Sequence, residues 1–338
     1  MKSLPILDFS LLDGTADDAA AFRSQLRQVT HDVGFFYLTG HGIGDDEFAR
    51  AIDTAQAFFA LPESDKLAIE NTYSPHFRGY TRVGGELTQG KVDWREQIDI
   101  GAERPAIPVE PETEDYWALQ GPNLWPEALP ELREFAESWI DRLNNISLRL
   151  LSAWAESLGA RPDHFDRAFA TAPSPLMKIV RYPGKDSDQP VQGVGAHKDL
   201  GVLTLLYVQD GKAGLQVEKD GEWIDAPPLP GAFVVNIGEM LEIATNGYLK
   251  ATSHRVIAPK AGDERISIPF FYCPALDAEI PSIELPAELA AESNGVTRDP
   301  SNPLYPVFGR NWLKSRVRAH PNVVEAHHPH LAIAPGSA

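Results

Sequence analysis

Apolar residues are spaced differently in the two halves of the chain. Between residues 132 and 158 they follow one another at steps of three and four, which predicts one long helix that Gly159 can end. From about residue 174, short runs rich in β-branched and aromatic residues alternate with turn signals such as Asp210-Gly211. Many short strands separated by turns are typical of a β-sandwich or a closed barrel. The pattern therefore predicts a helical first part and a strand-rich second part.

Shorter elements are predicted before the long helix. Thr15 and Asp18 have the spacing of a capping box at the start of one helix, and Asp45 and Asp46 can cap a second one. The apolar stretch 33–40 between these two helices is expected to form a strand that ends in glycine. The first part of the chain is therefore expected to be mixed, with helices and short strands.

Composition and charge limit the classes of protein and partner. The chain has 338 residues, of which 43% are hydrophobic, so it can bury a sizeable core. Its formal net charge of −18 disfavours binding to nucleic acid or to an anionic membrane surface. The single cysteine, Cys273, excludes an intramolecular disulfide and fits a reducing, cytoplasmic setting. No signal peptide or membrane span is expected, because no apolar run approaches about 20 residues.

Two strong metal ligands stand together at the head of an apolar run. His197 and Asp199 precede the stretch 202–208, whose β-branched and aromatic residues predict a buried strand. Side chains at i and i+2 of a strand point to the same face. Both ligands are therefore expected to aim at one point, with Lys198 on the other side. This pair would be half of a metal site.

A third strong ligand, His254, lies on another short strand-like run. Two histidines and one carboxylate that leave positions vacant form the facial triad suited to non-haem Fe(II). A single histidine is more often an ordinary polar residue of a strand or turn, but three such ligands together favour a metal site. The same three side chains would also suit Zn(II) in a hydrolase that activates water.

Arg265 and Ser267 are again two positions apart in a strand-like apolar run. A guanidinium offers a fork of donors that matches a carboxylate, and the serine hydroxyl adds one more donor. The simplest role of an arginine is a surface ion pair. A cation embedded in an apolar strand needs an anionic partner, however, and a dicarboxylate ligand would be one.

Together these residues resemble the iron(II)- and 2-oxoglutarate-dependent oxygenases of the isopenicillin N synthase-like family. The resemblance extends in order along residues 4–280. The N-terminal region of that family is similar to LPILDFS, DVGFFYLTGHGI, FFALPESDK and RGY. Its catalytic core is similar to MKIVRYPG, GLQV, VVNIGEMLEIATNGYLKATSHRV and RISIPFFYCP.

The resemblance implies a mixed α+β fold, in which a double-stranded β-helix (jelly-roll) core is flanked by N-terminal helices. His197, Asp199 and His254 would bind iron. Arg265 and Ser267 would hold the distal carboxylate of the cosubstrate 2-oxoglutarate. The implied activity uses O2 and couples oxidative decarboxylation of 2-oxoglutarate to hydroxylation or desaturation of a small organic substrate.

Other positions match the family less closely. Tyr182 matches a tyrosine that can hydrogen-bond 2-oxoglutarate, and core packing is an equal alternative for it. Many relatives carry asparagine two positions earlier, where this chain has Val180, so that contact would be absent. Glu239 replaces a more usual aspartate, which we interpret as turn chemistry. Four residues are candidates for the substrate pocket by position alone: Arg78, Tyr80, Lys198 and Phe271.

Two other functions and a division of the chain follow from this interpretation. Within the enzymes, the alternative is an oxidase of the same fold that does not use 2-oxoglutarate as cosubstrate, of the isopenicillin N synthase or ethylene-forming type. Outside the enzymes, it is a binding module without turnover.

The expected regions are 1–120 (N-terminal helices and strands), 121–172 (long helix), 173–280 (catalytic core) and 281–338 (C-terminal segment, with a loose tail from residue 326).

Overall fold

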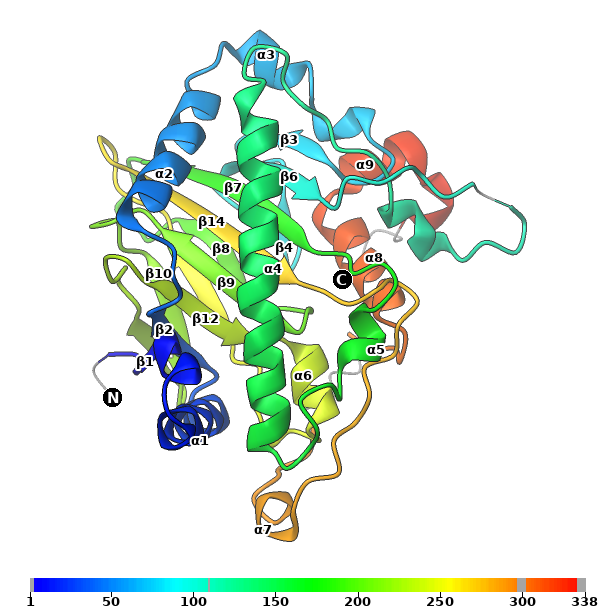
Figure 1. The fold of residues 1–338 in the computed structure, drawn as a ribbon. Helices are drawn as coiled ribbons and strands as arrows, with labels where there is room; N and C mark the ends of the chain where they lie inside the picture. The colour runs from blue at the N-terminus through cyan, green and yellow to red at the C-terminus, as the bar shows by residue number, and fades with distance from the viewer. Residues whose placement is uncertain (1–2, 109, 297–301, 333–338) are drawn as a thin grey trace.

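Two β-sheets face each other at the centre of the molecule (Figure 1). The computed structural model describes residues 3–108, 110–296 and 302–332. The eight strands of the larger sheet are, in spatial order, β1 (Ile6–Asp8), β2 (Phe35–Thr39), β12 (Phe233–Ile237), β9 (Leu203–Val208), β14 (Glu264–Tyr272), β7 (Leu176–Pro183), β6 (Glu96–Gly101) and β3 (Gly79–Thr81). The four strands of the smaller sheet are β11 (Glu222–Asp225), β10 (Leu215–Lys219), β13 (His254–Ile257) and β8 (Gln192–His197). This is the jelly-roll core that the resemblance implied.

Side chains of the larger sheet alternate between two apolar cores. On β7, Met177 and Ile179 belong to the core under the helices, whereas Val180 and Tyr182 belong to the core between the sheets. Successive strand residues point to opposite faces, so a strand buried on both sides is apolar at nearly every position. This explains why the predicted strands are continuous apolar runs. It also means that the i, i+2 pairs of these strands share one face of the barrel.

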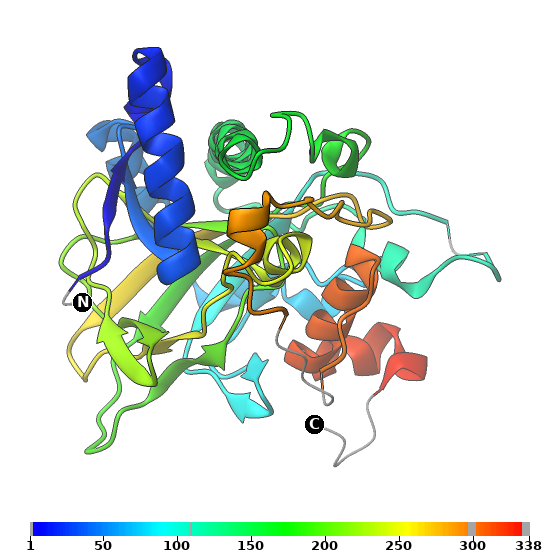
Figure 2. The same cartoon turned by 90° about the horizontal axis from the view of Figure 1, so that it is seen from below.

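Helices cover the outer face of the larger sheet. The long helix α4 (Glu131–Ser157) runs across β9 and β14, beside α1 (Ala16–Asp32) and α2 (Asp45–Phe59) (Figures 1 and 2). α4 confirms the helix predicted from apolar spacing, and Gly159 follows its end with a positive φ of 83°. Trp154 of α4 is fully buried, and its indole N–H donates to the Thr30 hydroxyl of α1 at 3.1 Å. Packing against two neighbours therefore fixes α4 as a support behind the strands that carry the site.

The predicted start of α1 is confirmed, and that of α2 is corrected. Thr15 and Asp18 form the expected capping box. The N-cap of α2 is Gly44, whose N–H donates to Glu47 at 3.2 Å, and Asp45 and Asp46 lie in the first turn. The acids still favour the helix from that position, because negative charge is stabilised near a helix N-terminus.

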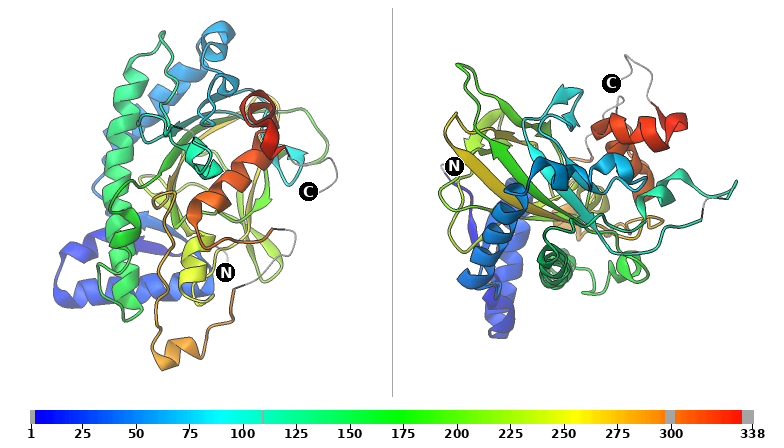
Figure 3. Two further views of the ribbon diagram at one scale, coloured as in Figure 1. Left: turned by 90° about the vertical axis from the view of Figure 1, so that its right-hand side faces the viewer. Right: turned by 90° about the horizontal axis from the view of Figure 1, so that it is seen from above.

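The C-terminal segment packs on the molecule, so the expected loose tail is wrong up to residue 332. Helices α8 (Phe308–Ala319) and α9 (Pro321–His327) lie on the flank of the sheets away from α4 (Figures 2 and 3). His328 stacks on Phe77 with ring centroids 5.5 Å apart, and its Nε2 lies 2.7 Å from the Pro75 carbonyl oxygen. The remainder of the expected tail, 333–338, lies outside the described residues. The division at residues 120, 172 and 280 stays a prediction.

The remaining elements are short. None of the helices within the described ranges has both the length and the apolar character needed to cross a membrane. A two-stranded ribbon and several short helices complete the fold: β4 (Leu87–Thr88), β5 (Lys91–Val92), α3 (Glu63–Leu67), α5 (Asp166–Phe169), α6 (Glu239–Ala244) and α7 (Ala287–Ala290).

Candidate metal centre

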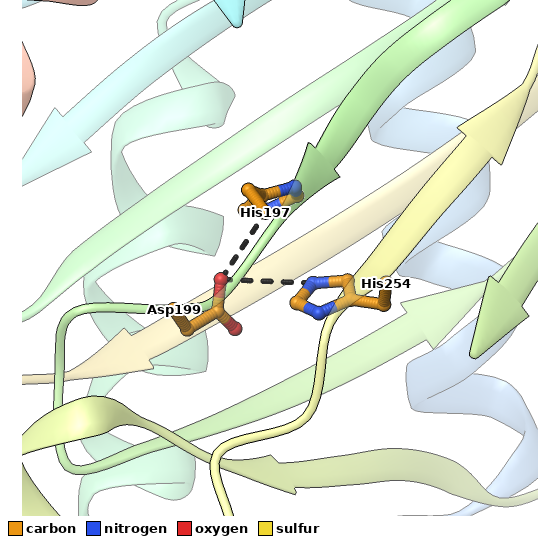
Figure 4. A group of neighbouring side chains, drawn as sticks. All are labelled: His197, Asp199 and His254. Carbon is orange, nitrogen blue, oxygen red and sulfur yellow. Dashed lines mark ion pairs between the residues drawn. The ribbon is translucent and has the colours of Figure 1, made fainter. Parts of the chain in front are cut away.

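His197, Asp199 and His254 meet where the chain passes from the smaller sheet to the larger one. His197 is the last residue of β8, and His254, the first residue of β13, is its cross-strand partner. Oδ1 of Asp199 lies 3.5 Å from Nε2 of His197 and 3.7 Å from Nε2 of His254 (Figure 4). One ligand atom from each residue lies within 4.8 Å of the other two. The structure thus brings the three predicted ligands together.

The predicted reason for this convergence is wrong for Asp199. β8 ends at His197, so Asp199 lies in the irregular segment before β9 and not on a shared strand face. The backbone carbonyl of Asp199 accepts the N–H of Glu239 at 2.8 Å, which ties this segment to the start of α6. Lys198 forms an ion pair with Glu242, whose carboxylate lies 3.3 Å from its Nζ. The turn, and not strand alternation, therefore directs the carboxylate toward the histidines.

Only one oxygen of Asp199 faces the histidines. The other oxygen, Oδ2, accepts the Thr204 hydroxyl at 2.6 Å and the Asn236 side-chain amide at 2.8 Å. Thr204 and Asn236 are buried cross-strand partners on β9 and β12. Two donors on adjacent strands of the larger sheet therefore fix the carboxylate with Oδ1 directed toward both imidazoles.

Backbone carbonyls orient both imidazole rings. Nδ1 of His197 lies 2.8 Å from the carbonyl oxygen of Gly195, and Nδ1 of His254 lies 3.2 Å from that of Thr252. A carbonyl only accepts, so each Nδ1 carries a proton, and Nε2 is the ring atom directed toward Asp199. The Phe35 ring packs against His254 at a centroid distance of 5.1 Å. These contacts hold both Nε2 atoms on the side of Asp199.

Burial and the contacts among His197, Asp199 and His254 shift the pKa values of these side chains. Burial, with a smaller effect from His197, lowers the pKa of His254 to about 4, so this imidazole is neutral at pH 7. Burial acts to raise the pKa of Asp199, but the imidazoles of His254 and His197 outweigh it and hold that pKa well below its usual range. A neutral imidazole and an ionised carboxylate are the forms that bind a metal ion.

This set of donors fits Fe(II). Two imidazole nitrogens and one carboxylate oxygen on one side of an ion leave further coordination positions open, which is the 2-His-1-carboxylate arrangement of non-haem iron. A cavity of about 460 Å³ is lined by His197 and Asp199, so an ion held there is accessible to small molecules. A structural zinc site would instead be closed by four protein ligands.

Arg265 and Ser267 lie on one face of β14, as predicted, and each is only 1% exposed. Nη1 of Arg265 donates to the Ser267 hydroxyl at 3.2 Å, and the guanidinium lies 4.9 Å from the ring centroid of Tyr182, its cross-strand partner. Nε and Nη2 of Arg265 have no hydrogen-bond partner, and no acid pairs with it among the described residues. A buried cation with unpaired N–H groups fits an anionic ligand. Arg265 is not part of the lining of the 460 Å³ cavity.

Sequence reasoning missed a second group of buried charges, of which Glu86, Arg95, Lys178 and Arg316 line the same cavity. Nζ of Lys178 lies 2.9 Å from Glu86, and Nη2 of Arg95 lies 3.1 Å from both Glu86 and Asp93. Lys178 stands in the apolar run LMKIV, the same signal that singled out Arg265, and this would have indicated it. We call the whole group the Glu86 cluster: Glu86, Asp93, Arg95, Asp99, Lys178, Arg316 and His320.

The position-based candidates divide into two groups. Lys198 and Phe271 line the cavity. Arg78 and Tyr80 do not, because Arg78 donates to the carbonyls at 76 and 119 and Tyr80 donates to a carboxylate at 96. Glu239 begins α6 and its side chain also lines the cavity, and its interpretation as turn chemistry stays a prediction. Burial raises the pKa of this carboxyl to about 7.

Comparisons with known proteins agree with this geometry. Residues 4–128 match the family described as non-haem dioxygenase in morphine synthesis N-terminal, and residues 173–274 match the 2OG-Fe(II) oxygenase superfamily. The 2-oxoglutarate-dependent dioxygenase frbJ of Dothideomycetidae sp. (strain 11243) is 36% identical, over 96% of this chain and 91% of its own. A homoarginine-6-hydroxylase of Arabidopsis thaliana is 37% identical, over 84% of this chain and 88% of its own. The solved structure of JOX2 in complex with 2OG, Fe and JA aligns with a TM-score of 0.70 at 28% identity, over 96% of this chain and 89% of that one.

Proposed function

The chain belongs to the 2OG-Fe(II) oxygenases, in the isopenicillin N synthase-like family, and we propose that His197, Asp199 and His254 hold its iron. The protein is an Fe(II)- and 2-oxoglutarate-dependent dioxygenase, which couples oxidative decarboxylation of 2-oxoglutarate to oxidation of a small organic substrate. One observation supports the residue assignment above the others: the three ligand atoms lie within 4.8 Å of one another beside an open cavity.

The protein's own groups act by binding and orientation. Bound iron supplies the site at which O2 is activated and the substrate is oxidised. Thr204 and Asn236 hold the Asp199 carboxylate so that one oxygen is presented to the ion. Arg265 and Ser267 receive the distal carboxylate of 2-oxoglutarate. The two guanidinium nitrogens without a hydrogen-bond partner, Nε and Nη2, support this assignment.

Tyr182 flanks this carboxylate position. Its ring lies against the guanidinium of Arg265 and forms part of the core between the sheets, so it both packs and borders the proposed ligand. Val180 belongs to the same apolar core. We assign Tyr182 to keeping the Arg265 guanidinium in place.

The prime substrate we propose is a small polar molecule, with homoarginine as the first one to test. The Arabidopsis thaliana relative is a homoarginine-6-hydroxylase, and its identity to this chain is 37%. The cavity next to His197 and Asp199 is lined by charged side chains, including Glu86 and Glu239, which suits a polar ligand. Neither nucleic acid nor a membrane surface is proposed as a partner, because the chain carries a net charge of −18.

An oxidase that dispenses with 2-oxoglutarate is less well supported. The relative frbJ is described as 2-oxoglutarate-dependent, and among the described residues Arg265 has no acid partner of the kind that a structural arginine would have. A hydrolase based on Zn(II) explains neither Arg265 nor the match to the 2OG-Fe(II) oxygenase superfamily over residues 173–274.

Succinate formation tests the proposed ligands. Protein loaded anaerobically with Fe(II) is given 2-oxoglutarate and O2, and we expect slow succinate release that requires the iron. His197→Ala and His254→Ala should each reduce the release to the background rate, because both remove a ligand. The exposed His330 provides a matched control, and His330→Ala should turn over normally. Undiminished release from either ligand variant would contradict the assignment.

A further inference from the structure

We propose that the prime substrate is a small organic acid, and that its carboxylate is received by Arg95, Lys178 and Arg316 on the wall of the cavity. This position is separate from Arg265, which receives the cosubstrate. The inference rests on the proposed function, because it concerns the substrate that is oxidised beside His197.

The cavity wall is rich in cations although the chain as a whole is strongly acidic. Among the described residues, six cationic side chains line the cavity: Arg95, Lys178, Lys198, Lys314, Arg316 and Arg318. Three acidic side chains of the described residues line it: Glu86, Asp199 and Glu239. Asp199 is assigned to the metal, so cations outnumber the remaining acids of the wall. The net charge of the whole chain is −18. A hollow lined by one sign of charge concentrates ligands of the opposite sign.

The acids of the Glu86 cluster hold its cations in place from behind the wall. Asp93 and Asp99 are 0% and 1% exposed and do not line the cavity, whereas Arg95, Lys178 and Arg316 do. The positive groups therefore border the cavity and part of the compensating negative charge lies deeper. Guanidinium and ammonium groups that are already oriented bind a carboxylate with little further loss of side-chain freedom.

Glu86 does not reverse this polarity. It borders the cavity, but one of its oxygens accepts Lys178 at 2.9 Å, and the other lies 3.1 Å from Nη2 of Arg95. Its charge is therefore already compensated by two cations of the wall. Arg95 and Arg316 border the cavity, and their partners Asp93 and Asp99 do not.

The two carboxylate positions are separated along β7. Tyr182, beside Arg265, and Lys178 are four positions apart and point to the same face, so they stand about 13 Å apart along the strand. One small dicarboxylate bound at Arg265 does not also reach Lys178 across this length. The cluster cations are therefore available to a different molecule.

The lining also provides an apolar surface for the body of such an acid. Phe271 of β14 and Trp312 of α8 both line the cavity, with ring centroids 6.4 Å apart. On α8, the lining residues Trp312, Ser315, Arg316 and Ala319 follow one another at helical steps of three, one and three, so one face of this helix forms part of the wall. The substrate we infer has a carboxylate at the cation set and an apolar or extended body along these rings.

Matched acids and amides test the inference directly. The probes are L-homoarginine, indole-3-acetic acid and 3-phenylpropionic acid, each paired with its own carboxamide. Two quantities are measured: stimulated succinate formation by the iron-loaded enzyme, and binding to the metal-free protein by titration calorimetry. We expect at least one acid to act or bind at a concentration about tenfold lower than its amide, because a charge-assisted hydrogen bond to a buried cation is lost in the amide. If no acid exceeds its amide by this margin, the inference is overturned.

Variants that keep the charge but remove the guanidinium fork locate the position. Arg95→Lys and Arg316→Lys should raise the half-saturating concentration of the preferred acid about tenfold and leave that of 2-oxoglutarate unchanged. Arg161→Lys, at an exposed pair with Asp163, is the control. A raised 2-oxoglutarate requirement in Arg95→Lys would instead assign the cations to the cosubstrate and overturn the inference. Absence of iron-dependent succinate from the unaltered enzyme would contradict the proposed function alone, since acid binding is measured separately on metal-free protein.

Discussion

Arg265 and the Glu86 cluster are both buried, but their charges are compensated differently. Arg265 is a single cation whose Nε and Nη2 have no partner among the described residues. The cluster contains three cations and three carboxylates, with pairs such as Lys178 to Glu86 at 2.9 Å. Arg265 on β14, and Lys178 and Asp99 of the cluster on β7 and β6, belong to strands of the same eight-stranded sheet.

The difference indicates what each group is for. An isolated buried charge destabilises a fold, so it persists where a ligand completes it. A set of paired charges is compensated by its own members, and removing one member leaves the others exposed to the full desolvation penalty. We therefore expect loss of the Arg265 charge to affect ligand binding without destabilising the fold. Loss of a charge within the cluster should destabilise the fold, whereas a change there that keeps the charge should mainly weaken binding of the substrate acid.

The largest expected effect is on stability, in the cluster. Lys178→Met keeps the length of the side chain but leaves Glu86 and Asp99 without their shared cation. We expect the free energy of unfolding in urea to fall by about 3–5 kcal/mol. Lys212→Met, at an exposed ion pair with Asp263, should change it by less than about 1 kcal/mol. If the two variants were equally stable, the cluster would not have the structural role we assign to it.

The same type of substitution at Arg265 should weaken ligand binding without lowering stability. Arg265→Met removes the receptor for the distal carboxylate, so the half-saturating concentration of 2-oxoglutarate should rise about 10- to 100-fold, as measured by succinate formation. The free energy of unfolding should stay the same or increase, because an unpaired buried charge is lost. If Arg265→Met were destabilised and kept a normal 2-oxoglutarate requirement, Arg265 would have a structural role, and the role in ligand binding would be contradicted.

The parts of the site that could be predicted from sequence are those whose residues lie close together along the chain. His197 with Asp199, and Arg265 with Ser267, are recognisable because both members of each pair lie within three residues of chain. The Glu86 cluster draws on a loop, two strands and α8, segments that only the folded chain brings together. Lys178 was nevertheless detectable, since it interrupts an apolar strand as Arg265 does.

Two structural predictions failed for physical reasons that sequence patterns do not contain. The segment that carries Asp199 is held by a hydrogen bond from the N–H of Glu239, at the start of α6. This is a contact between segments that are distant in sequence. Residues 327–332 pack because the His328 ring stacks on Phe77 and its Nε2 contacts the Pro75 carbonyl, although their composition resembles a loose tail. The helix at 131–157 was predictable because its apolar spacing is a local property.

A smaller effect is expected at the hydrogen bond that orients the metal ligand Asp199. Thr204→Val is close to isosteric but removes the hydroxyl that holds Oδ2 of Asp199. We expect the affinity of the metal-free protein for Fe(II), measured anaerobically, to fall about tenfold, because outer hydrogen bonds orient metal ligands. Thr204→Ser should restore most of it. Equal affinities for valine and threonine at this position would show that Asn236 alone orients the carboxylate.

A last effect concerns the pH dependence of stability in the cluster. Burial, with a further contribution from Arg316, lowers the pKa of His320 to about 3, whereas an unfolded histidine titrates near 6.5. Below pH 6.5 the unfolded chain binds a proton that the folded chain does not, so stability falls as the pH falls toward 3, by up to about 1.4 kcal/mol per pH unit. His320→Gln should remove this contribution and flatten urea-unfolding free energies between pH 6.5 and 4. An unchanged slope would mean that His320 is charged in the folded protein.

The most direct test of the central claim is an anaerobic titration of the metal-free protein with Fe(II) in the presence of 2-oxoglutarate, followed by visible absorption. A weak metal-to-ligand charge-transfer band should grow until about one iron is bound per chain, since one ion completes the three-ligand site. The band should be absent in His197→Ala and should require more 2-oxoglutarate in Arg265→Met. An identical band in His197→Ala, or none in the unaltered protein, would contradict the assignment of iron to His197, Asp199 and His254.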